Sequence, residues 1–597
     1  MADQRFAGKE RIMDLPAIPN EPISTDYDWV LKPPMFGLSR WGDIFNPRQA
    51  VALVTFVRKV RDVYRAVLRE TGDEEYAKVV TTYLALAVDR LVDKNATSCL
   101  WNSPGEKLEH VFGRQAIPMA WDYGELNPFS GQMGDWSSAV QWIAEVIEHC
   151  SRLSGLAYVL QSNAMSLPFE SSFFDAVIID PPYYDAVPYA DLSDFFYVWL
   201  KRSVGDLYRD LFATPLTPKA NELVQQSNKV TSAQKRIKDR NFYESGLTKS
   251  LSEINRVLKP GGVCVVAFAH KTIAAWEQLI GSILSSGFQV TASWPISTEM
   301  MARLRARSSA ALASSVWLVC RKRRPEAGVA SWKKVQTELD QRIRERLDFF
   351  LKEGIKGADA LLSAIGPALE VFGRYQSVEK VTGEKVAIAE FLDKVREVVA
   401  HHALSTVLSE QELGNVDPPT AFYVLWKWTF EPTIQNGKLT NSGGKGNGNH
   451  ILVPFDDALK IARSVGADPE VLLKTHVLTQ EKEYVRLLGP NERKHVCGLG
   501  EIARDGTPPA TIDMIHRALN LWAAIEHSQL EEYLEKSGAK NNETFWRVAQ
   551  ALSNLLPLQS KEKQLLDGLL ARHAGGAETV RPRELRSLDE FVEEKVE

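Results

Sequence analysis

The stretch Phe174-Asp175-Ala176-Val177-Ile178-Ile179-Asp180-Pro181-Pro182-Tyr183 decides the fold of this 597-residue chain. Its apolar first half predicts a buried strand. The two prolines stiffen the chain after that strand, because each ring fixes φ and removes a backbone N–H. We therefore expect Asp180 and Tyr183 to lie in a rigid loop. An ordinary strand-end turn is the alternative, and a second Asp-Pro-Pro at 417–419, which no expected strand precedes, is interpreted as such a turn.

Strands and helices alternate around this stretch, which is typical of a doubly wound α/β sheet. The expected strands are 156–160, 174–179, 263–268, 288–294 and 315–320. Helices are expected at 137–152, 243–258 and 273–286, with a Lys-Pro-Gly-Gly turn at 259–262. One long helical pattern runs from Asn46 to about Leu91. The sequence thus predicts a helical and loop-containing N-terminal region (1–150), an α/β region (151–330) and a mainly helical C-terminal domain (331–597).

The composition narrows the class of protein. The net charge is −5, so any surface that binds nucleic acid has to be local or supplied by a partner. The cysteines are scattered without a Cys-x-x-Cys pair, which argues against a zinc site and against a disulfide framework. No signal peptide and no apolar run of transmembrane length is found, so we expect a cytoplasmic protein without a membrane partner.

Further blocks of sequence accompany the Asp-Pro-Pro-Tyr loop. They include 37–43 (Gly-Leu-Ser-Arg-Trp-Gly-Asp), 112–115 (Phe-Gly-Arg-Gln), 189–199 (Tyr-Ala-Asp-Leu-Ser-Asp-Phe-Phe-Tyr-Val-Trp), 256–262 (Arg-Val-Leu-Lys-Pro-Gly-Gly) and 512–516 (Ile-Asp-Met-Ile-His). With the loop, these blocks resemble a family of bacterial adenine-specific DNA methyltransferases from phage-defence and restriction-like operons. The resemblance covers nearly the full chain. It implies an α/β fold with an incomplete class I methyltransferase sheet, which is Rossmann-like, flanked by helical N-terminal and C-terminal regions.

The resemblance implies methyl transfer from S-adenosylmethionine to the N6 amino group of a flipped-out adenine in DNA. That nitrogen is a poor nucleophile, because its lone pair is delocalised into the ring. Asp180 and a backbone carbonyl at Pro181, in a loop stiffened by Pro182, accept its N–H bonds and draw electron density onto the nitrogen. Tyr183 offers a flat face on which the flipped base stacks.

The cofactor site is only partly accounted for. Asn163, Ala164 and Asp180 are the positions that the resemblance assigns to cofactor contacts, although loop capping explains Asn163 equally well. Related enzymes also hold S-adenosylmethionine on a Gly-rich turn of the form Asp-Pro-Phe-x-Gly-x-Gly. That motif is not found in this sequence.

The family's fold has the strand order 3-2-1-4-5-7-6, which implies that strands are missing from this sequence together with the Gly-rich motif. If 156–160 is strand 3 and 174–179 is strand 4, strands 1 and 2 have to lie between them in space, yet 1–150 has a helical and loop-like pattern. Such a gap leaves strand edges unpaired. We therefore predict that a complementary methyltransferase subunit carrying the Gly-rich motif donates the two strands.

Double-stranded DNA is the substrate that the resemblance implies, with phosphate contacts expected from basic residues. The candidates are Lys201, Arg202, Lys219, Lys235, Arg236, Lys238, Arg240, Arg303, Arg305 and Arg307. For each, a solvated charged surface is the alternative. The C-terminal domain recognises the target sequence or docks the partner, and other defence-operon proteins are further candidate partners. A non-catalytic DNA-binding or assembly subunit of a phage-defence complex stays open, as does methylation of RNA, of a protein glutamine or of cytosine.

Overall fold

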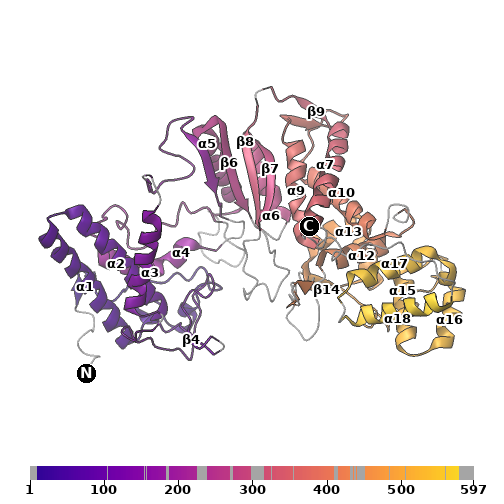
Figure 1. The fold of residues 1–597 in the computed structure, drawn as a ribbon, viewed down its shortest axis with the longest axis horizontal. Coiled ribbons are helices and arrows are strands. Elements are labelled where there is room, and N and C mark those ends of the chain that lie inside the picture. The colour runs from indigo at the N-terminus through magenta and orange to yellow at the C-terminus, as the bar shows by residue number, and fades with distance from the viewer. Residues whose placement is uncertain are drawn as a thin grey trace, which may run out of the picture. The chain divides into compact units, whose positions relative to one another are not determined.

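A computed structural model shows two compact units, Met1–Asn163 with Pro182–Leu247, and Ala164–Pro181 with Thr248–Glu597 (Figure 1). It describes residues 10–576 except 104, 133, 153–154, 156, 183–186, 225–237, 269–272, 297–314, 325, 354, 356, 409–413, 431–433, 436–437, 440–450, 483, 504–505 and 558–559. The chain therefore leaves the first unit before the motif strand and returns to it at Pro182. None of the helices in these ranges has both the length and the apolar character needed to cross a bilayer.

The first unit is mainly helical. Its elements are β1 (Arg11–Ile12), β2 (Leu15–Pro16), the 3-10 helices η1 (Pro33–Phe36) and η2 (Trp41–Ile44), α1 (Pro47–Thr71), α2 (Glu74–Lys94), β3 (Trp101–Asn102), β4 (Lys107–Leu108), α3 (Trp136–Ser151), α4 (Tyr189–Val204) and the first turns of α5 (Arg240–Val257). The expected single helix over 46–91 is wrong. Gly72 ends α1 in the left-handed region at φ 68°, and the Asp73 carboxylate caps α2 by accepting from the N–H of Tyr76.

Helix α4 forms the centre of this unit, although it follows the Asp-Pro-Pro-Tyr loop directly. Phe195 and Trp199 on α4 are fully buried, and they pack against Phe45 with ring centroids 6.0 and 5.3 Å away. The guanidinium of Arg202, also on α4, forms a buried bidentate ion pair with Glu21. The residues before α1 and the helix after the loop are thus tied into one core.

The second unit carries a mixed four-stranded sheet. Its strands are β5 (Phe174–Ile179), β6 (Leu258–Phe268), β7 (Phe288–Ile296) and β8 (Ser315–Lys322). Their order is β5-β6-β8-β7, in which β5 is parallel to β6 while β8 is antiparallel to both β6 and β7. The strands expected at 174–179, 263–268, 288–294 and 315–320 are confirmed.

One face of this sheet is well covered. Cys264, Val266 and Phe268 of β6 are buried, and Trp276 of α6 (Ile273–Ser285) contacts Phe268 edge-on at 5.0 Å. The register pairs Ile178 with Val265, which places Ile178 on the opposite face. There Val265 is only half-buried and Ile178 is 69% exposed. The two faces of the sheet are therefore unequally protected.

Two local expectations differ from the structure. The expected strand at 156–160 is wrong, because 157–160 is irregular and Tyr158 and Val159 are 92% and 99% exposed. A strand needs a neighbour to pair its backbone groups, and this segment has none among the described residues.

The expected turn at 259–262 lies within β6 instead. The ladder passes over these four residues, since Phe174 pairs with Leu258 and Ala176 with Val263.

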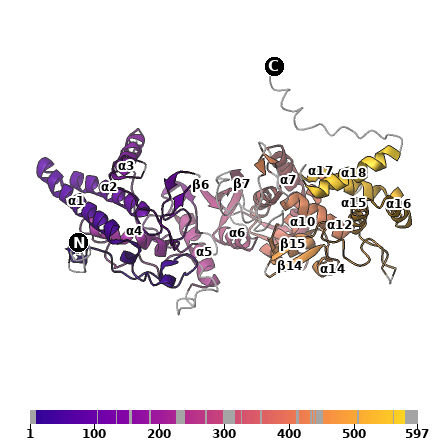
Figure 2. The same ribbon diagram turned by 90° about the horizontal axis from the view of Figure 1, so that it is seen from below.

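Helices dominate the rest of the second unit, and two of them pack against β7. The elements are β9 (Val329–Ser331), α7 (Trp332–Lys352), α8 (Gly357–Ser363), α9 (Ile365–Phe372), β10 (Ser377–Glu379), α10 (Ile388–Leu408), α12 (Pro418–Phe430), β11 (Ile434–Gln435), β12 (Lys438–Leu439), β13 (Val453–Pro454), α13 (Phe455–Ser464), α14 (Pro469–Lys474), β14 (Leu478–Glu481), β15 (Tyr484–Leu487), α15 (Thr511–Ala523), α16 (His527–Lys536), the 3-10 helix η4 (Ala539–Asn541), α17 (Glu543–Leu555) and α18 (Lys561–Gly576). Helices α8 and α9 contact β7, and α9 is labelled beside this strand in Figure 1. Helix α14 packs against β14 farther along the chain (Figure 2).

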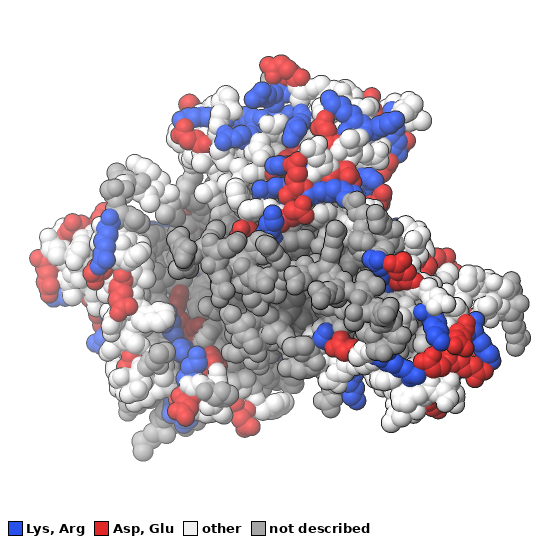
Figure 3. Space-filling model, turned by 45° about the vertical axis from the view of Figure 1, so that its right-hand side comes forward, with Lys and Arg blue, Asp and Glu red and all other residues white. Residues whose placement is uncertain are grey.

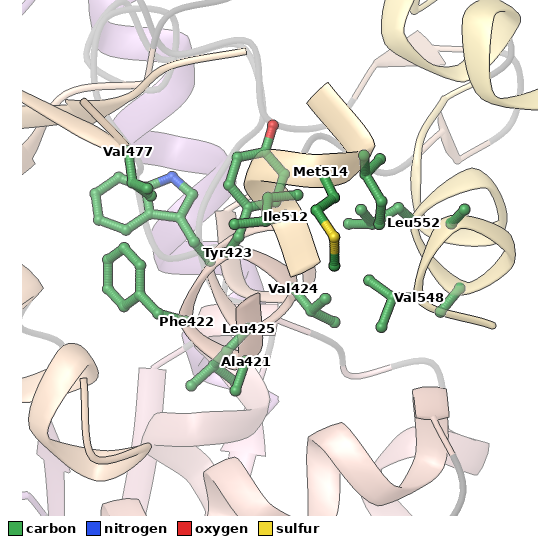
Figure 4. Close-up of a cluster of buried hydrophobic side chains, with 14 of the residues drawn as sticks. Ala421, Phe422, Tyr423, Val424, Leu425, Val477, Ile512, Met514, Val548 and Leu552 are labelled. Atoms are coloured by element: carbon green, nitrogen blue, oxygen red, sulfur yellow. The ribbon is translucent and has the colours of Figure 1, made fainter. Parts of the chain in front are cut away.

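The core of this helical part is apolar. Val424 of α12 points toward Met514 of α15 and Val548 of α17 (Figure 4). The second Asp-Pro-Pro lies here, and its interpretation as a turn is wrong. Asp417 caps α12 by accepting from the N–H of Thr420, and its other oxygen accepts from the N–H of Thr511 at the start of α15. Its prolines begin a helix, where a missing N–H costs nothing.

Candidate active site

The Asp-Pro-Pro residues lie where the chain passes from the second unit to the first. Asp180 follows the last residue of β5 and is exposed to solvent. Pro181 is buried and Pro182 half-buried. Tyr183, together with Tyr184 and Asp185, lies outside the described residues. The structure thus places an unshielded carboxylate at the carboxyl end of a strand, the edge at which α/β sheets bind ligands.

Tyr243 fixes this loop from outside, and the sequence analysis did not single it out. Its hydroxyl donates a 2.5 Å hydrogen bond to the carbonyl oxygen of Pro182. The side chain is only 2% exposed. It lies in the first turn of α5, where Asp239 caps the helix by accepting from the N–H of Phe242. No sequence signal identifies such a residue, because its partner is a backbone carbonyl.

The residues expected to contact the cofactor do not form an enclosed site. Asn163 and Ala164 are both exposed, and they follow the irregular segment 157–160. Asn163 is the last residue of the first unit before the chain enters the second, which Ala164 begins. S-adenosylmethionine needs close backbone approach and enclosure. The described residues therefore do not fit the cofactor by themselves.

Buried charges hold the beginning of α4, just after the loop. The Glu222 carboxylate accepts from the N–H of Ala190 at 2.8 Å, which stabilises the helix N-terminus. Asp194 forms a 2.8 Å ion pair with Lys219 and accepts from the N–H of Thr217. These contacts attach residues 217–222 to the helix that leads away from Asp-Pro-Pro-Tyr.

Asp191 belongs to the same buried cluster. Its pKa is raised to about 6, mainly by burial and also by the nearby Asp194 and Glu222, whereas Lys219 and a hydrogen bond from Ser24 oppose the shift. Its side chain is only 3% exposed. The cluster therefore contains a carboxyl group that protonates slightly below neutral pH.

Several basic residues expected at DNA phosphates are engaged inside the protein. Arg202 is buried against Glu21, Lys219 pairs with Asp194, and the buried Lys238 donates to the carbonyl oxygen of Lys219. The expectations for the buried Arg202 and Lys238 are wrong, because each cation compensates a buried polar group, whereas the role of the partly exposed Lys219 stays a prediction. Lys201 donates to the carbonyl oxygen of Thr214, and Arg240 pairs with Glu244.

The surface charge agrees with this correction. Lys235, Arg236, Arg303, Arg305 and Arg307 lie outside the described residues. In Figure 3, the described Lys and Arg side chains are interspersed with Asp and Glu and do not gather into one basic surface on the face shown. The described residues therefore supply no ready-made phosphate-binding face in that view.

Apolar side chains are exposed on both sequence segments that flank the expected gap in the sheet. Before the gap they are Trp142, Val146 and Ile147 of α3, and Tyr158, Val159 and Leu160. After it, Phe173 and Ile178 are exposed at and near β5. Among the described residues no strand pairs with the outer edge of β5. Phe173 and Ile178 thus lie near and on a strand with a free edge, and exposed apolar surface of this kind is typical of places where polypeptides bind.

Comparisons with family models, with curated proteins and with solved structures gave no match to this chain. Within the described ranges, no group of three or more His, Cys, Asp or Glu side chains is arranged to hold a metal ion.

Proposed function

We propose that this chain is the catalytic-loop half of a split class I methyltransferase that modifies N6 of adenine in DNA. One observation carries the proposal. The strand order β5-β6-β8-β7, with β8 alone antiparallel, equals the 4-5-7-6 half of that fold. The Asp-Pro-Pro sequence follows the strand that takes the position of strand 4. If the sheet order matched only by chance, there would be no reason for the Asp-Pro-Pro sequence to follow the strand at position 4.

The role of this chain's residues follows from hydrogen bonding. Asp180 and the Pro181 carbonyl accept the two N–H bonds of the target amino group, so nitrogen becomes more electron-rich as it attacks. Such acceptors act mainly in the transition state, when positive charge develops on the nitrogen. S-adenosylmethionine, when bound in the complete enzyme, supplies the methyl group.

The proposal includes a complementary subunit that brings the Gly-rich turn and two strands. The right-handed crossover rule supports this. The connections β5-α5-β6 and β6-α6-β7 advance in the same direction along the sheet, so both helices lie on one face. Strands added outward from β5 advance the other way, and their helices therefore cover the opposite face. That is the face on which Ile178 is exposed.

A second function is favoured by a different observation. Arg202 and Lys238 are buried, so they are not available to phosphate, and Lys219 is paired with Asp194. A non-catalytic assembly subunit of a phage-defence complex needs the docking edge and no DNA contacts. Under this alternative, Asp180 has no catalytic role.

Methylation by the complete complex separates the two functions. We propose to purify the complex from its source cells through a tag on this chain, with wild-type Asp180 or with Asp180→Ala. Duplex DNA is then incubated with S-adenosylmethionine, and its nucleosides are analysed by mass spectrometry. We expect N6-methyladenine from the wild-type complex and a loss of about a hundredfold or more in the variant.

The other outcomes are equally informative. Methylcytosine or methylated RNA as the main product contradicts the adenine assignment. A wild-type complex that methylates no substrate favours the assembly subunit. An Asp180→Ala complex that is as active as wild type moves the chemistry to another residue.

A further inference from the structure

Two tryptophans lie in the cross-strand row that leads away from Asp180. The register of β5 on β6, continued by one residue, aligns Asp180 with Ala267. Ala267 pairs with Trp317 of β8, and Trp317 pairs with Trp294 of β7. Because Ala267 lies two residues beyond the partner of Ile178, this row is on the less covered face of the sheet. All of these residues belong to the second unit.

The distance along this row follows from the strand spacing. Strands β6, β8 and β7 lie side by side, and β5 precedes them in the sheet (Figure 1). Three inter-strand steps of ~4.8 Å put Trp294 about 14 Å from Asp180. Stacked nucleotides of one DNA strand rise about 3.4 Å each, so this distance corresponds to about four nucleotides.

Trp294 offers an aromatic ring to solvent on that face. Its side chain is 52% exposed, whereas the neighbouring Ser293 is buried on the opposite face, against Gly366 of α9. The guanidinium of Arg346, on α7, lies 5.9 Å from the centroid of the Trp294 ring. An exposed ring beside a cation is the combination with which proteins hold an unpaired nucleotide, since the base stacks and the phosphate is neutralised.

Arg346 differs from the other arginines of α7 in its charge balance. Arg342 pairs with Glu370 and Arg344 pairs with Asp340. Arg346 has no carboxylate partner among the described residues, and its buried Nε has no hydrogen-bond partner there. A guanidinium stays charged in proteins, so an anion from outside the described part of the chain is expected to balance it.

Aromatic rings hold this guanidinium in place. It lies 5.1 Å from the ring centroid of Phe349 and 5.3 Å from that of Phe350, in addition to its contact with Trp294. Phe350 is fully buried, so this side of the contact is anchored in the core. Rings orient a guanidinium without neutralising it, and the planar fork of arginine matches the oxygens of a phosphate.

DNA fits this position better than the complementary subunit does. That subunit is expected at the free edge of β5, whereas Trp294 lies on β7, the strand at the other edge of the sheet. The helices of strands added beyond β5 cover the β5 side. DNA, by contrast, has to reach Asp180 under the proposed function, and the row of Asp180 leads to Trp294.

We propose that Trp294 and Arg346 form a binding site for an unpaired nucleotide of the DNA strand near the target adenine. The base stacks on the Trp294 ring, and the guanidinium of Arg346 donates to the phosphate. This inference rests on the proposed function and assigns a substrate contact to this chain. The site binds and orients the strand, and neither residue touches a reacting atom.

The test measures binding of a fluorescently labelled single-stranded oligothymidine to the complex purified from the source cells, by anisotropy at several salt concentrations. We expect Arg346→Met to weaken binding about tenfold. It should also reduce the slope of log K against log salt by about 0.7, the value for one phosphate contact on a single strand. Trp294→Ala should weaken binding about tenfold with the slope unchanged, and Trp294→Phe by about threefold or less, because a ring remains.

Arg572 provides a matched control. Its guanidinium lies 5.8 Å from the ring centroid of Trp522, but Glu531 neutralises it at 2.7 Å. Arg572→Met should therefore leave both the affinity and the salt slope at the wild-type values. Urea unfolding of each chain reports its stability, and sedimentation of each complex over a dilution series reports its assembly.

Each outcome has a defined meaning. A wild-type complex that does not bind the oligonucleotide, or an Arg346→Met complex with wild-type affinity and slope, overturns the inference. Equal losses in Arg346→Met and Arg572→Met indicate a general effect on stability and also contradict it. If Arg346→Met binds DNA normally but loses the complementary subunit, the missing anion is a carboxylate of that subunit, and the nucleotide site is wrong.

The proposed function is tested separately from the site. A complex that makes no N6-methyladenine but loses oligonucleotide binding in Arg346→Met contradicts the methyltransferase assignment and supports the nucleotide site. A complex that makes N6-methyladenine and binds the oligonucleotide equally well with and without Arg346 supports the methyltransferase assignment and overturns the site.

Discussion

The two outer strands of the same sheet have very different surroundings. Helices α8 and α9 pack on β7, and the approach is so close that a Cβ on Gly366 of α9 would lie 2.0 Å from the Cβ of Ser293. On β5, by contrast, Ile178 is 69% exposed and no described strand or helix covers it. Among the described residues, helices therefore cover one outer strand of the sheet, while the other outer strand stays exposed.

The difference has a physical explanation in the connections between strands. Right-handed crossovers in one direction cover one face only, so a doubly wound sheet needs strands on both sides of its switch point. Among the described residues, the sheet continues from β5 on one side only. A free parallel edge with an uncovered apolar face is costly in water and prone to aggregation, which argues that it is occupied in the assembled protein.

The strongest expected effect comes from placing a charge on the free side. Ile178→Lys puts an ammonium group into the proposed interface, where it loses its hydration, but leaves it in water in the isolated chain. We expect binding of the complementary subunit to weaken by at least about a hundredfold, or ~2.7 kcal/mol. The stability of the isolated chain should change by less than about 0.5 kcal/mol. Sedimentation of the purified complex over a dilution series measures the first quantity, and urea unfolding measures the second.

A matched control distinguishes an effect of charge at the β5 edge from the general effect of adding a charge to the surface. Val381, in the loop after β10, is an exposed apolar residue as well. Val381→Lys should leave both assembly and stability unchanged. If the two lysine variants assemble equally well, the β5 side is not the docking surface.

On the covered side the expected effect is on folding. Gly366→Ala adds a methyl group that meets the side chain of Ser293, so α9 has to move away from β7. We expect the isolated chain to lose about 2 kcal/mol in urea unfolding. Gly281→Ala in α6 is the control, because nothing lies within 4 Å of its added methyl, and it should gain up to about 1 kcal/mol. Equal effects of both substitutions would mean that α9 does not depend on this close approach.

The smallest effect concerns Asp191, on the helix that follows the loop. Burial raises its folded-state pKa to about 6 from the usual 3.8, so the folded protein binds this proton more tightly than the unfolded chain. The stabilisation is complete below the usual pKa and is lost as the pH rises through 6. Asp191→Asn removes the cost of the buried charge. At pH 7.5 we expect it to stabilise the first unit by about 1 kcal/mol, with no gain at pH 4.

Hydrogen exchange of α4 peptides measures this stability at both pH values. Lys219→Met is an informative comparison, because it removes the cation that favours the charged form of Asp191 and should steepen the pH dependence. A gain from Asp191→Asn that is equal at both pH values would contradict the assigned titration.

The strands of the sheet were predicted from the sequence more accurately than the segments around them. The motif strand was predicted at its observed bounds, since an apolar run before Asp-Pro-Pro allows few other structures. The strand at 156–160 was wrong, because alternation and composition do not reveal whether a pairing partner exists. The Gly72-Asp73 break within 46–91 was missed for a different reason. The apolar periodicity continues across it, while the left-handed glycine and the cap act on two residues only.

Candidate site residues could be predicted from the sequence only where the residue types themselves are informative. Asp180 and its prolines were singled out because their order is informative, and their catalytic role stays a prediction. Tyr243 was not, since it acts on a backbone atom 61 residues away in the sequence. The roles expected of Arg202 and Lys238 are wrong because charge in a sequence does not show its partner, and both side chains are buried in ion pairs within the first unit.

Calorimetric titration of S-adenosylmethionine tests the central claim, that this chain is half of an enzyme completed at β5, most directly. The cofactor is titrated into the isolated chain and into the complex purified from the source cells. We predict no measurable binding to the isolated chain, because the Gly-rich turn is not part of it, and micromolar binding to the complex. Micromolar binding to the isolated chain would contradict the account, since the chain would then contain a complete cofactor site.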